Sequence, residues 1–396
     1  MNKKNIISVS ILTGILIFST FTSCKKDFLD INQNPNSPAD AGVRELLPSA
    51  EAAIAHSVGN NLAIYCGLYA QFWTQSPASS QYKTFEQYSP NANDFDRVWK
   101  SLYADALMDL KTIESKATSG GLPNYVAIAK ILEAYSFQLL TDNFGDIPFS
   151  EALQAESNVL SPHYDTQQKV YQGVITLLDE ALSIIGQGDA LTPDVDDLLL
   201  HGDMALWEEF AYTLKLRVYM RLSEIDPATA QAGIMGLDTT AVFLGAGEEV
   251  RIDYSSAGGN TNPLYSSIVV LGFTQNLVAS STAIDYLLNN NDTLRVFAFY
   301  TPASNGSQLG IAQGNYTVSP STPVSIPSPA VGGDGGDETS ALAPVKLMTG
   351  YESLFLQAEA AARGRADRQP RSGPVARDHE PVPRDRSEEH TSELQS

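Results

Sequence analysis

Aromatic rings and side-chain amides are interspersed through YAQFWTQSPASSQYKTFEQYSPNANDFDRVW, residues 69–99. A flat aromatic face can stack against the apolar side of a pyranose ring, and amides can hydrogen-bond its hydroxyl groups. These two residue types at this density are therefore what the capture of a carbohydrate, without chemistry upon it, would require. The predicted ligand contacts are Trp73, Tyr82, Tyr88 and Gln75.

The same aromatic residues can instead pack the first helices of the fold, and Trp99 is expected to do so. Exposed aromatic residues beside amides indicate a binding surface only when the rings face solvent. Tyr300 and Tyr316, which lie beside and inside a long loop, are weaker candidates for ligand contact.

Residues that could support catalysis or metal binding are not grouped in the sequence. A serine nucleophile elbow, a Walker loop and a dinucleotide fingerprint are absent, and GAG at 245–247 lacks the third glycine. Carboxylates are plentiful, but sequence alone places no two of them across a sugar. We therefore expect no enzyme activity and no cofactor, with a glycoside hydrolase as the alternative. The five histidines do not have the spacing of metal ligands; they are His56, His163, His201, His379 and His390.

The acidic loop GGDGGDE, residues 332–338, raises the question of a calcium site. Asp334, Asp337 and Glu338 could supply oxygen ligands, but their spacing does not match the twelve-residue calcium loop. A solvated loop is the favoured interpretation.

The composition is that of a folded protein with a substantial core, since 43% of residues are hydrophobic and 18% are charged. Forty-six acidic residues against 25 basic ones give a formal net charge of −21. Such a charge repels nucleic acid and anionic lipid surfaces, so nucleic acid is excluded as a partner.

The N-terminus, residues 1–23, has the parts of an export signal: basic Lys3 and Lys4, a short apolar run, and small polar residues before Cys24. The apolar run is too short and interrupted to span a bilayer securely. FTSC resembles the lipobox of bacterial lipoproteins, in which the cysteine carries lipid such as palmitate. Cys24 is the predicted anchor, because several acyl chains hold a protein durably at a membrane. An ordinary signal peptide with a chance cysteine is the alternative.

If Cys24 carries lipid, Cys66 has no disulfide partner. Its apolar context, LAIYCGLYAQFW, predicts an inert, buried side chain. Residues 24–40 are rich in Asn, Pro and Asp, which favour turns, and are expected to form a flexible tether.

The tail, residues 365–396, differs sharply from the rest of the chain. It holds six of the thirteen arginines, no lysine and no aromatic residue, and it shows no hydrophobic periodicity. Its end, RSEEHTSELQS, resembles a translated sequencing adapter, and the preceding stretch resembles a shifted reading frame. We expect this tail to be a disordered artefact, and the domain of residues 41–364 to be incomplete at its C-terminus.

Apolar residues at helical spacing dominate the chain up to residue 236, and breakers at 119–124, 144–148 and 186–189 separate the helices. Alternating helices with short connections predict antiparallel pairs stacked as irregular tetratricopeptide-like hairpins. The predicted buried faces are Val98, Leu102, Ala106, Leu110 and Ile113; Ile128, Leu132, Tyr135 and Leu139; Tyr171, Val174, Leu178, Leu182 and Ile185; and Trp207, Phe210, Leu214 and Val218.

The region 236–343 has a different character. SIVVLGF, residues 267–273, is β-prone, residues 279–290 favour a helix, and 302–344 form a long loop. A helix resumes over 351–364. The predicted fold class is mainly α, with a loop-rich ligand-binding face and minor β structure.

Four sequence blocks resemble successive signatures of the SusD/RagB family in their order and spacing along the chain. The start SCKKDFLD supports the same resemblance. The blocks are YVAIAKILEAYSFQLLTDNFGDIPFSEAL (125–153), SPHYDTQQKVYQGVITLLDEAL (161–182), GDMALWEEFAYTLKLRVYMRLSEIDP (202–227) and PVKLMTGYESLFLQAEAAARG (344–364).

Residues within these blocks also have a structural interpretation. Gly145 and Pro148 shape a chain reversal, and Asp146 can accept bonds from backbone amides. Arg217 and Arg221 lie one helical turn apart and are expected to bridge acidic partners such as Glu208 or Asp142.

The resemblance implies a nutrient-binding lipoprotein of the Bacteroidetes outer membrane, facing the cell exterior. Members of the family sit over the extracellular mouth of a TonB-dependent β-barrel transporter, which is SusC-like, and lack catalysis. They capture oligosaccharides or, in some branches, peptides. Glycan capture is the function we expect. Peptide capture, a surface-anchored glycoside hydrolase and a helical-repeat adaptor remain as alternatives.

Overall fold

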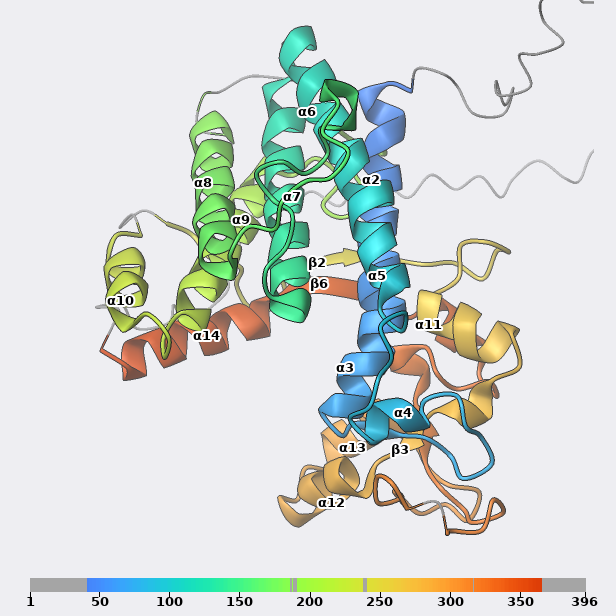
Figure 1. The fold of residues 1–396 in the computed structure, drawn as a ribbon. Coiled ribbons are helices and arrows are strands. Elements are labelled where there is room, and N and C mark those ends of the chain that lie inside the picture. Colours follow the sequence, from blue (N-terminus) through green and yellow to red (C-terminus); the bar gives the residue numbers. More distant parts are fainter. Residues whose placement is uncertain (1–40, 186, 188–190, 238–240, 316, 365–396) are drawn as a thin grey trace, which may run out of the picture.

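The computed structural model describes residues 41–185, 187, 191–237, 241–315 and 317–364. Its long helices stand side by side in one lobe, here called the helical lobe (Figure 1). The helices of this lobe are α2 (Val43–Ser57), α5 (Asp96–Lys100), α6 (Met108–Gly120), α7 (Pro123–Phe144), α8 (Gln167–Ile185), α9 (Met204–Arg221), α10 (Pro227–Met235) and α14 (Gly350–Ala362).

The second lobe, here called the loop-rich lobe, lies beyond the lower end of α2 in Figure 1 and contains short elements joined by long loops. A π-helical segment, η2 (Val58–Leu62), continues α2 into this lobe as α3 (Ala63–Tyr69). The other helical elements among the described residues of this lobe are α4 (Lys83–Glu86), α11 (Pro263–Tyr265), η5 (Ser266–Val270), η6 (Thr274–Asn276), α12 (Ser281–Asn289), α13 (Thr293–Phe299), η7 (Pro329–Val331) and η8 (Glu338–Leu342).

Strand structure is confined, in the described residues, to three short antiparallel pairs. β1 (Trp73–Thr74) pairs with β3 (Val278–Ala279), and β4 (Tyr300–Thr301) pairs with β5 (Ile326–Pro327). The third pair is β2 (Glu249–Ile252) with β6 (Val345–Thr349), which leads directly into α14.

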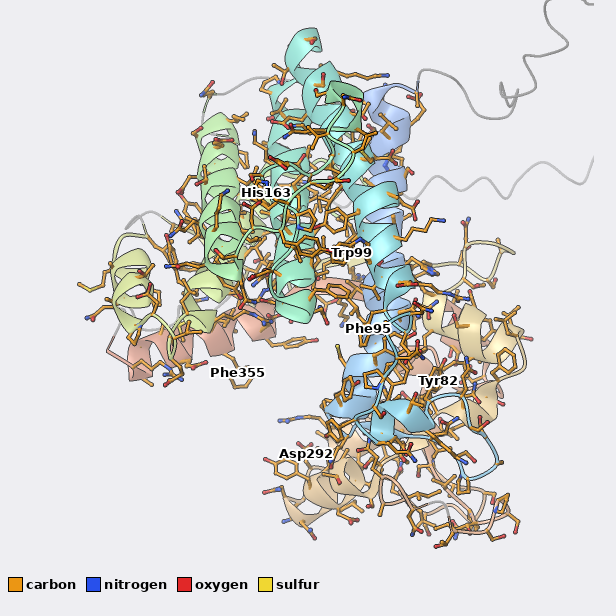
Figure 2. All side chains as sticks on the ribbon, in the orientation of Figure 1. Tyr82, Phe95, Trp99, His163, Asp292 and Phe355 are labelled. Atoms are coloured by element: carbon orange, nitrogen blue, oxygen red, sulfur yellow. The ribbon has the colours of Figure 1, made fainter. Side chains whose placement is uncertain are left out.

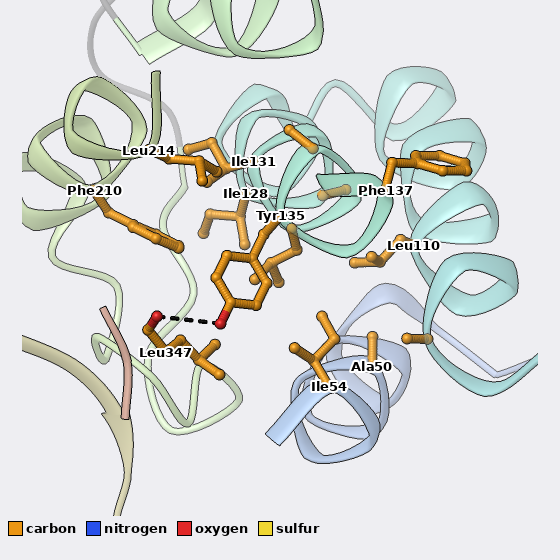
Figure 3. Packing of buried hydrophobic residues seen from close by; sticks show 14 of the residues in the cluster. Ala50, Ile54, Leu110, Ile128, Ile131, Tyr135, Phe137, Phe210, Leu214 and Leu347 are labelled. Carbon is orange, nitrogen blue, oxygen red and sulfur yellow. Dashed lines mark hydrogen bonds between the residues drawn. The ribbon is translucent and has the colours of Figure 1, made fainter. Parts of the chain in front are cut away.

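The core of the helical lobe forms around α7, most of whose residues are buried. Tyr135 lies at its centre beside Ile128 and Phe210, and its hydroxyl donates a hydrogen bond of 3.1 Å to the carbonyl oxygen of Leu347 (Figure 3). That bond satisfies the buried phenol and ties β6 to the helices, because a buried polar group without a partner is costly.

Local sequence explains where these helices begin and end. Asp203 caps α9, since its carboxylate accepts hydrogen bonds from the amides of Ala205 and Leu206 at 3.0 and 3.2 Å. Gly121, with φ of +68°, ends α6 in the left-handed conformation, and Pro123 opens α7 at its first turn.

The mainly α fold with tetratricopeptide-like hairpins and minor β structure is confirmed. The predicted helical faces are buried, with only Leu139, Leu182 and Ile185 partly exposed. Arg221 pairs with Asp142 at 2.8 Å, and Asp146 accepts a hydrogen bond from the amide of Gln167 at 2.9 Å.

The β-prone prediction for SIVVLGF is wrong, because Ser266–Val270 forms a π-helical segment, η5. The side chain of Asn262 accepts hydrogen bonds from the amides of Leu264 and Tyr265, and Pro263 occupies the first helical position. A capped start with a preset φ therefore outweighs the β preference of the branched residues that follow.

The predictions for residues 1–23, the anchor Cys24, the tether 24–40, Tyr316 and the tail 365–396 lie outside the described residues. Within the part of the chain that is described, no helix combines the length and apolar character needed to cross a bilayer.

Candidate functional site

Trp73 lies in β1 with its ring partly buried between the two small cores of the loop-rich lobe. The ring meets Tyr300 edge to face, with centroids 5.6 Å apart. It also packs closely on Gly67, where a side-chain Cβ would collide with the indole. Trp73 therefore joins α3 to the strands, and only part of its ring faces solvent.

Gln75 is only 2% exposed and uses both of its amide atoms inside the loop that follows β1. Its oxygen accepts a hydrogen bond from the amide of Tyr82, and its nitrogen donates one of 2.8 Å to Ser79 Oγ. In this conformation Gln75 holds the backbone of Tyr82 in place.

Tyr82 is half-buried and meets Tyr65 and Phe85 edge to face, at centroid distances of 6.4 and 6.2 Å. Burial raises the pKa of Tyr82 to about 12, so its hydroxyl stays protonated and can donate a hydrogen bond at neutral pH. The Tyr82 side chain keeps part of its surface exposed.

Tyr88 is 66% exposed and follows α4 with a positive φ of 54°. Its ring tilts against Tyr69 at a centroid distance of 5.5 Å, while its other face is open to solvent. An aromatic ring held on one side and open on the other suits stacking against a sugar.

Further rings, which the sequence analysis did not select, continue this set toward the helical lobe. Phe95 meets Tyr65 at 5.1 Å and Phe144 at 6.1 Å, and Phe144 meets Trp99 at 5.1 Å. Trp99 does pack against its neighbours as expected, but it remains partly exposed. In Figure 2 the labelled Tyr82, Phe95 and Trp99 follow one another along the face shown.

Two residues considered from sequence are placed differently from expectation. Tyr300 is fully buried, and its hydroxyl donates to the carbonyl oxygen of Phe72 at 3.0 Å, so it is a core residue and not a ligand contact. Cys66 is exposed, not buried, because it faces outward from α3. Partial desolvation raises the pKa of Cys66, which keeps it in the less reactive thiol form at neutral pH.

Two carboxylates of the acidic loop 332–338 make hydrogen bonds within the protein. Asp334 is buried and accepts hydrogen bonds from Thr301 Oγ1 at 2.7 Å and the amide of Gly336 at 2.8 Å. Asp337 caps η8 by accepting from the amide of Thr339. Among the described residues, no group of three or more His, Cys, Asp or Glu side chains could hold a metal ion.

A cluster around Ser150 has the residue types of a hydrolytic triad. Ser150 Oγ lies 3.5 Å from His163 Nε2, and His163 Nδ1 lies 2.8 Å from Glu151. However, the Ser150 hydroxyl donates to the buried carboxylate of Asp165 at 2.8 Å. That carboxylate stays ionised as a weak base, because hydrogen bonds from Lys169 and Ser150 hold the pKa of Asp165 well below its usual range despite burial. The serine is therefore not activated for attack.

An open pocket of about 450 Å³ lies elsewhere in the loop-rich lobe, between α13, η7 and η8. Phe297 and Leu342 are among its apolar lining, and Ser328 and Thr339 are among its polar lining. It is lined by none of the ligand contacts predicted from sequence.

The protein therefore combines a scaffold of helical hairpins with a loop-rich lobe that carries partly exposed aromatic rings. The chain belongs to the SusD-like family, whose model, described as "Starch-binding associating with outer membrane", matches residues 35–371.

Solved structures share this fold. A "chitin-binding protein" is 24% identical with a TM-score of 0.68, and the match covers 83% of this chain and 72% of that one. A SusD/RagB family protein from Bacteroides thetaiotaomicron is 25% identical with a TM-score of 0.67, covering 83% and 69%. A chitin-binding SusD homolog from Flavobacterium johnsoniae is 20% identical with a TM-score of 0.65, covering 80% and 66%. No curated protein matches the sequence.

Proposed function

We propose that this protein captures oligosaccharides at the outer membrane surface and delivers them, unaltered, to a TonB-dependent β-barrel transporter of the SusC-like kind. The observation that carries the proposal is the pair Tyr82 and Tyr88, held on an ordered loop with free aromatic surface, in a chain of the SusD-like family. Trp73 and Gln75 support the same loop from inside, and the part of the Trp73 ring that faces solvent extends the contact surface.

Alpha-glucans are the first ligands to test because the family model is described as starch-binding. Chito-oligosaccharides are the second, because two structures with this fold are chitin-binding proteins.

The test is to incubate purified protein with malto- and chito-oligosaccharides, measure heat by calorimetry, and analyse the same samples by chromatography. Capture predicts binding heat with intact sugars. Product formation would favour a hydrolase, and heat with peptides alone would favour peptide capture. No ligand heat, together with co-purification of a β-barrel, would favour an adaptor.

The anchor and the partner are tested in cells. Metabolic labelling with palmitate should mark the protein, and Cys24→Ser should abolish the label and release the protein from the membrane fraction. A tagged protein should co-purify with a β-barrel transporter. An unlabelled mature protein, or one found free in the cytosol, would contradict the proposed delivery.

A further inference from the structure

The exposed ring of Tyr164 lies over the indole of Trp99 on the helical lobe. Their centroids are 6.2 Å apart and their planes differ by 22°, so the rings are stacked with an offset. Trp99 also contacts the rings of Tyr103 and Phe144, at centroid distances of 4.8 and 5.1 Å. Tyr164 itself is 62% exposed, which leaves much of its ring in water.

The backbone on both sides of Tyr164 is fixed. On one side, His163 donates its amide to Glu151 at 3.1 Å, and its ring contacts the same carboxylate. On the other side, Asp165 exchanges two backbone hydrogen bonds with Ile147, at 2.9 and 3.1 Å. An exposed tyrosine held this firmly is pre-organised, so binding to it costs little additional conformational entropy.

Exposed polar side chains belong to the same loop region as Tyr164, where they contact its neighbours in the chain or the carboxylate of Asp165. The side chains of His163, Lys169 and Glu151 are 54, 52 and 41% exposed. They offer both donors and acceptors beside an aromatic face, the combination that sugar hydroxyls and the apolar side of a pyranose require.

The ring pair is continuous with the site around Tyr88. Successive ring contacts run from Tyr88 to Tyr69, Phe85, Phe95, Phe144, Trp99 and finally Tyr164, at centroid distances between 5.1 and 6.2 Å. Phe85 is buried, whereas Phe95, Phe144 and Trp99 are partly exposed. Figure 2 shows the labelled Tyr82, Phe95, Trp99 and His163 in sequence along one face, from the loop-rich lobe to the helical lobe.

We infer that Tyr164 on Trp99 forms a second sugar-binding platform, and that the preferred ligand is a glycan chain long enough to reach it from Tyr88. The inference rests on the proposed function and names the class of ligand that the site selects. A long chain held at one platform meets the other at high effective concentration, so its affinity exceeds that of a short one.

The experiment compares a disaccharide with an octasaccharide of the sugar that the unmodified protein binds. Tyr164→Ala should weaken octasaccharide binding about tenfold, as expected for one lost stacking contact, and leave disaccharide binding at Tyr88 unchanged. Tyr88→Ala should weaken both. Tyr164→Phe, which keeps the ring, should bind the octasaccharide within about twofold of the unmodified protein.

Circular dichroism and urea titration of Tyr164→Ala distinguish the loss of a ligand contact from a loss of folding. Because Tyr164 is exposed, its replacement should change the free energy of unfolding only slightly. Octasaccharide affinity that is unchanged in Tyr164→Ala but reduced in Tyr88→Ala would overturn this inference and leave the proposed function standing. Failure of the unmodified protein to bind any saccharide would overturn both.

Discussion

Arg217 donates two hydrogen bonds to the side-chain oxygen of Gln138, from Nε at 3.1 Å and from Nη2 at 2.8 Å. Its Nη1 lies 3.3 Å from Glu352, and the guanidinium lies over the Tyr135 ring, 5.2 Å from its centroid. One buried arginine on α9 therefore joins α7 and α14.

Replacing this arginine should destabilise the helical lobe. Arg217→Ala leaves the oxygen of Gln138 buried without a donor, so we expect a loss of about 3 kcal/mol in the free energy of unfolding. Arg221→Ala is the matched control one turn away, because Arg221 is 51% exposed and its partner Asp142 keeps a hydrogen bond from the Tyr171 hydroxyl. Its loss should stay below about 1 kcal/mol. Urea titrations that give equal losses for the two variants would contradict the assigned role.

Glu133 should make stability fall as the pH rises. Burial and the nearby carboxylate of Glu114 raise its pKa from 4.5 to about 7. Between these two values the folded state keeps a proton that the unfolded state has released, so stability present below pH 4.5 is lost as the pH approaches 7. Glu133→Gln should remove this dependence on pH. The free energy of unfolding of the variant, relative to that of the unmodified protein, should therefore rise by about 3 kcal/mol between pH 4.5 and pH 7.5. A constant difference at every pH would show that Glu133 has an ordinary pKa.

Asp165 should act with the opposite sign. Its pKa lies below the ordinary 3.8, because hydrogen bonds from Lys169 and Ser150 outweigh the effect of burial. The stabilisation is therefore present above about pH 4 and is lost as the pH falls through the folded-state pKa. Asp165→Ala leaves the amides of Phe149 and Ser150 without an acceptor and should cost about 3 kcal/mol at pH 7.

Asp146→Ala is the control for this loop, since Asp146 is exposed and accepts one backbone hydrogen bond, from Gln167. It should cost about 1 kcal/mol. Thermal unfolding of both variants at pH 7 measures the difference, and near-equal midpoints would mean that Asp165 does not hold the Tyr164 loop.

The helical lobe could be predicted in detail because its signals are local. In α9 the apolar residues recur every three or four positions, and Trp207, Phe210, Leu214 and Val218 are all fully buried. The same spacing gives no information on which faces of different helices meet. The sequence therefore predicts acidic partners for Arg217 but does not identify Gln138 as a further partner.

The site was harder to predict because it depends on contacts distant in sequence. Nothing local marks Tyr164, which lies in the loop before α8, while its partner Trp99 lies in α5, far earlier in the chain. Gln75 shows the opposite error. An amide among aromatic residues predicts a ligand contact, but in the fold the side chain points inward and donates a hydrogen bond to Ser79. Tyr300 likewise lies beside a loop in sequence but is buried by its pairing in β4.

Gly67 should be required for the position of Trp73. A methyl group there would collide with the indole, so Gly67→Ala should force the ring outward and cost about 1–3 kcal/mol. Gly258→Ala is a control, because its added Cβ would meet no atom within 4 Å. Tryptophan fluorescence should shift to the red in Gly67→Ala only, and an unchanged spectrum would contradict the close packing.

The central claim is that glycan is held on the rings of Tyr82 and Tyr88. The most direct measurement is the calorimetric affinity of Tyr82→Ala/Tyr88→Ala for the oligosaccharide that the unmodified protein binds. Tyr286→Ala is the control, because Tyr286 on α12 is 68% exposed, closely matching the 66% of Tyr88. The account predicts at least a tenfold loss in the double variant, from about 1 kcal/mol or more per stacked ring, and no change in the control. An affinity unchanged in the double variant would contradict it.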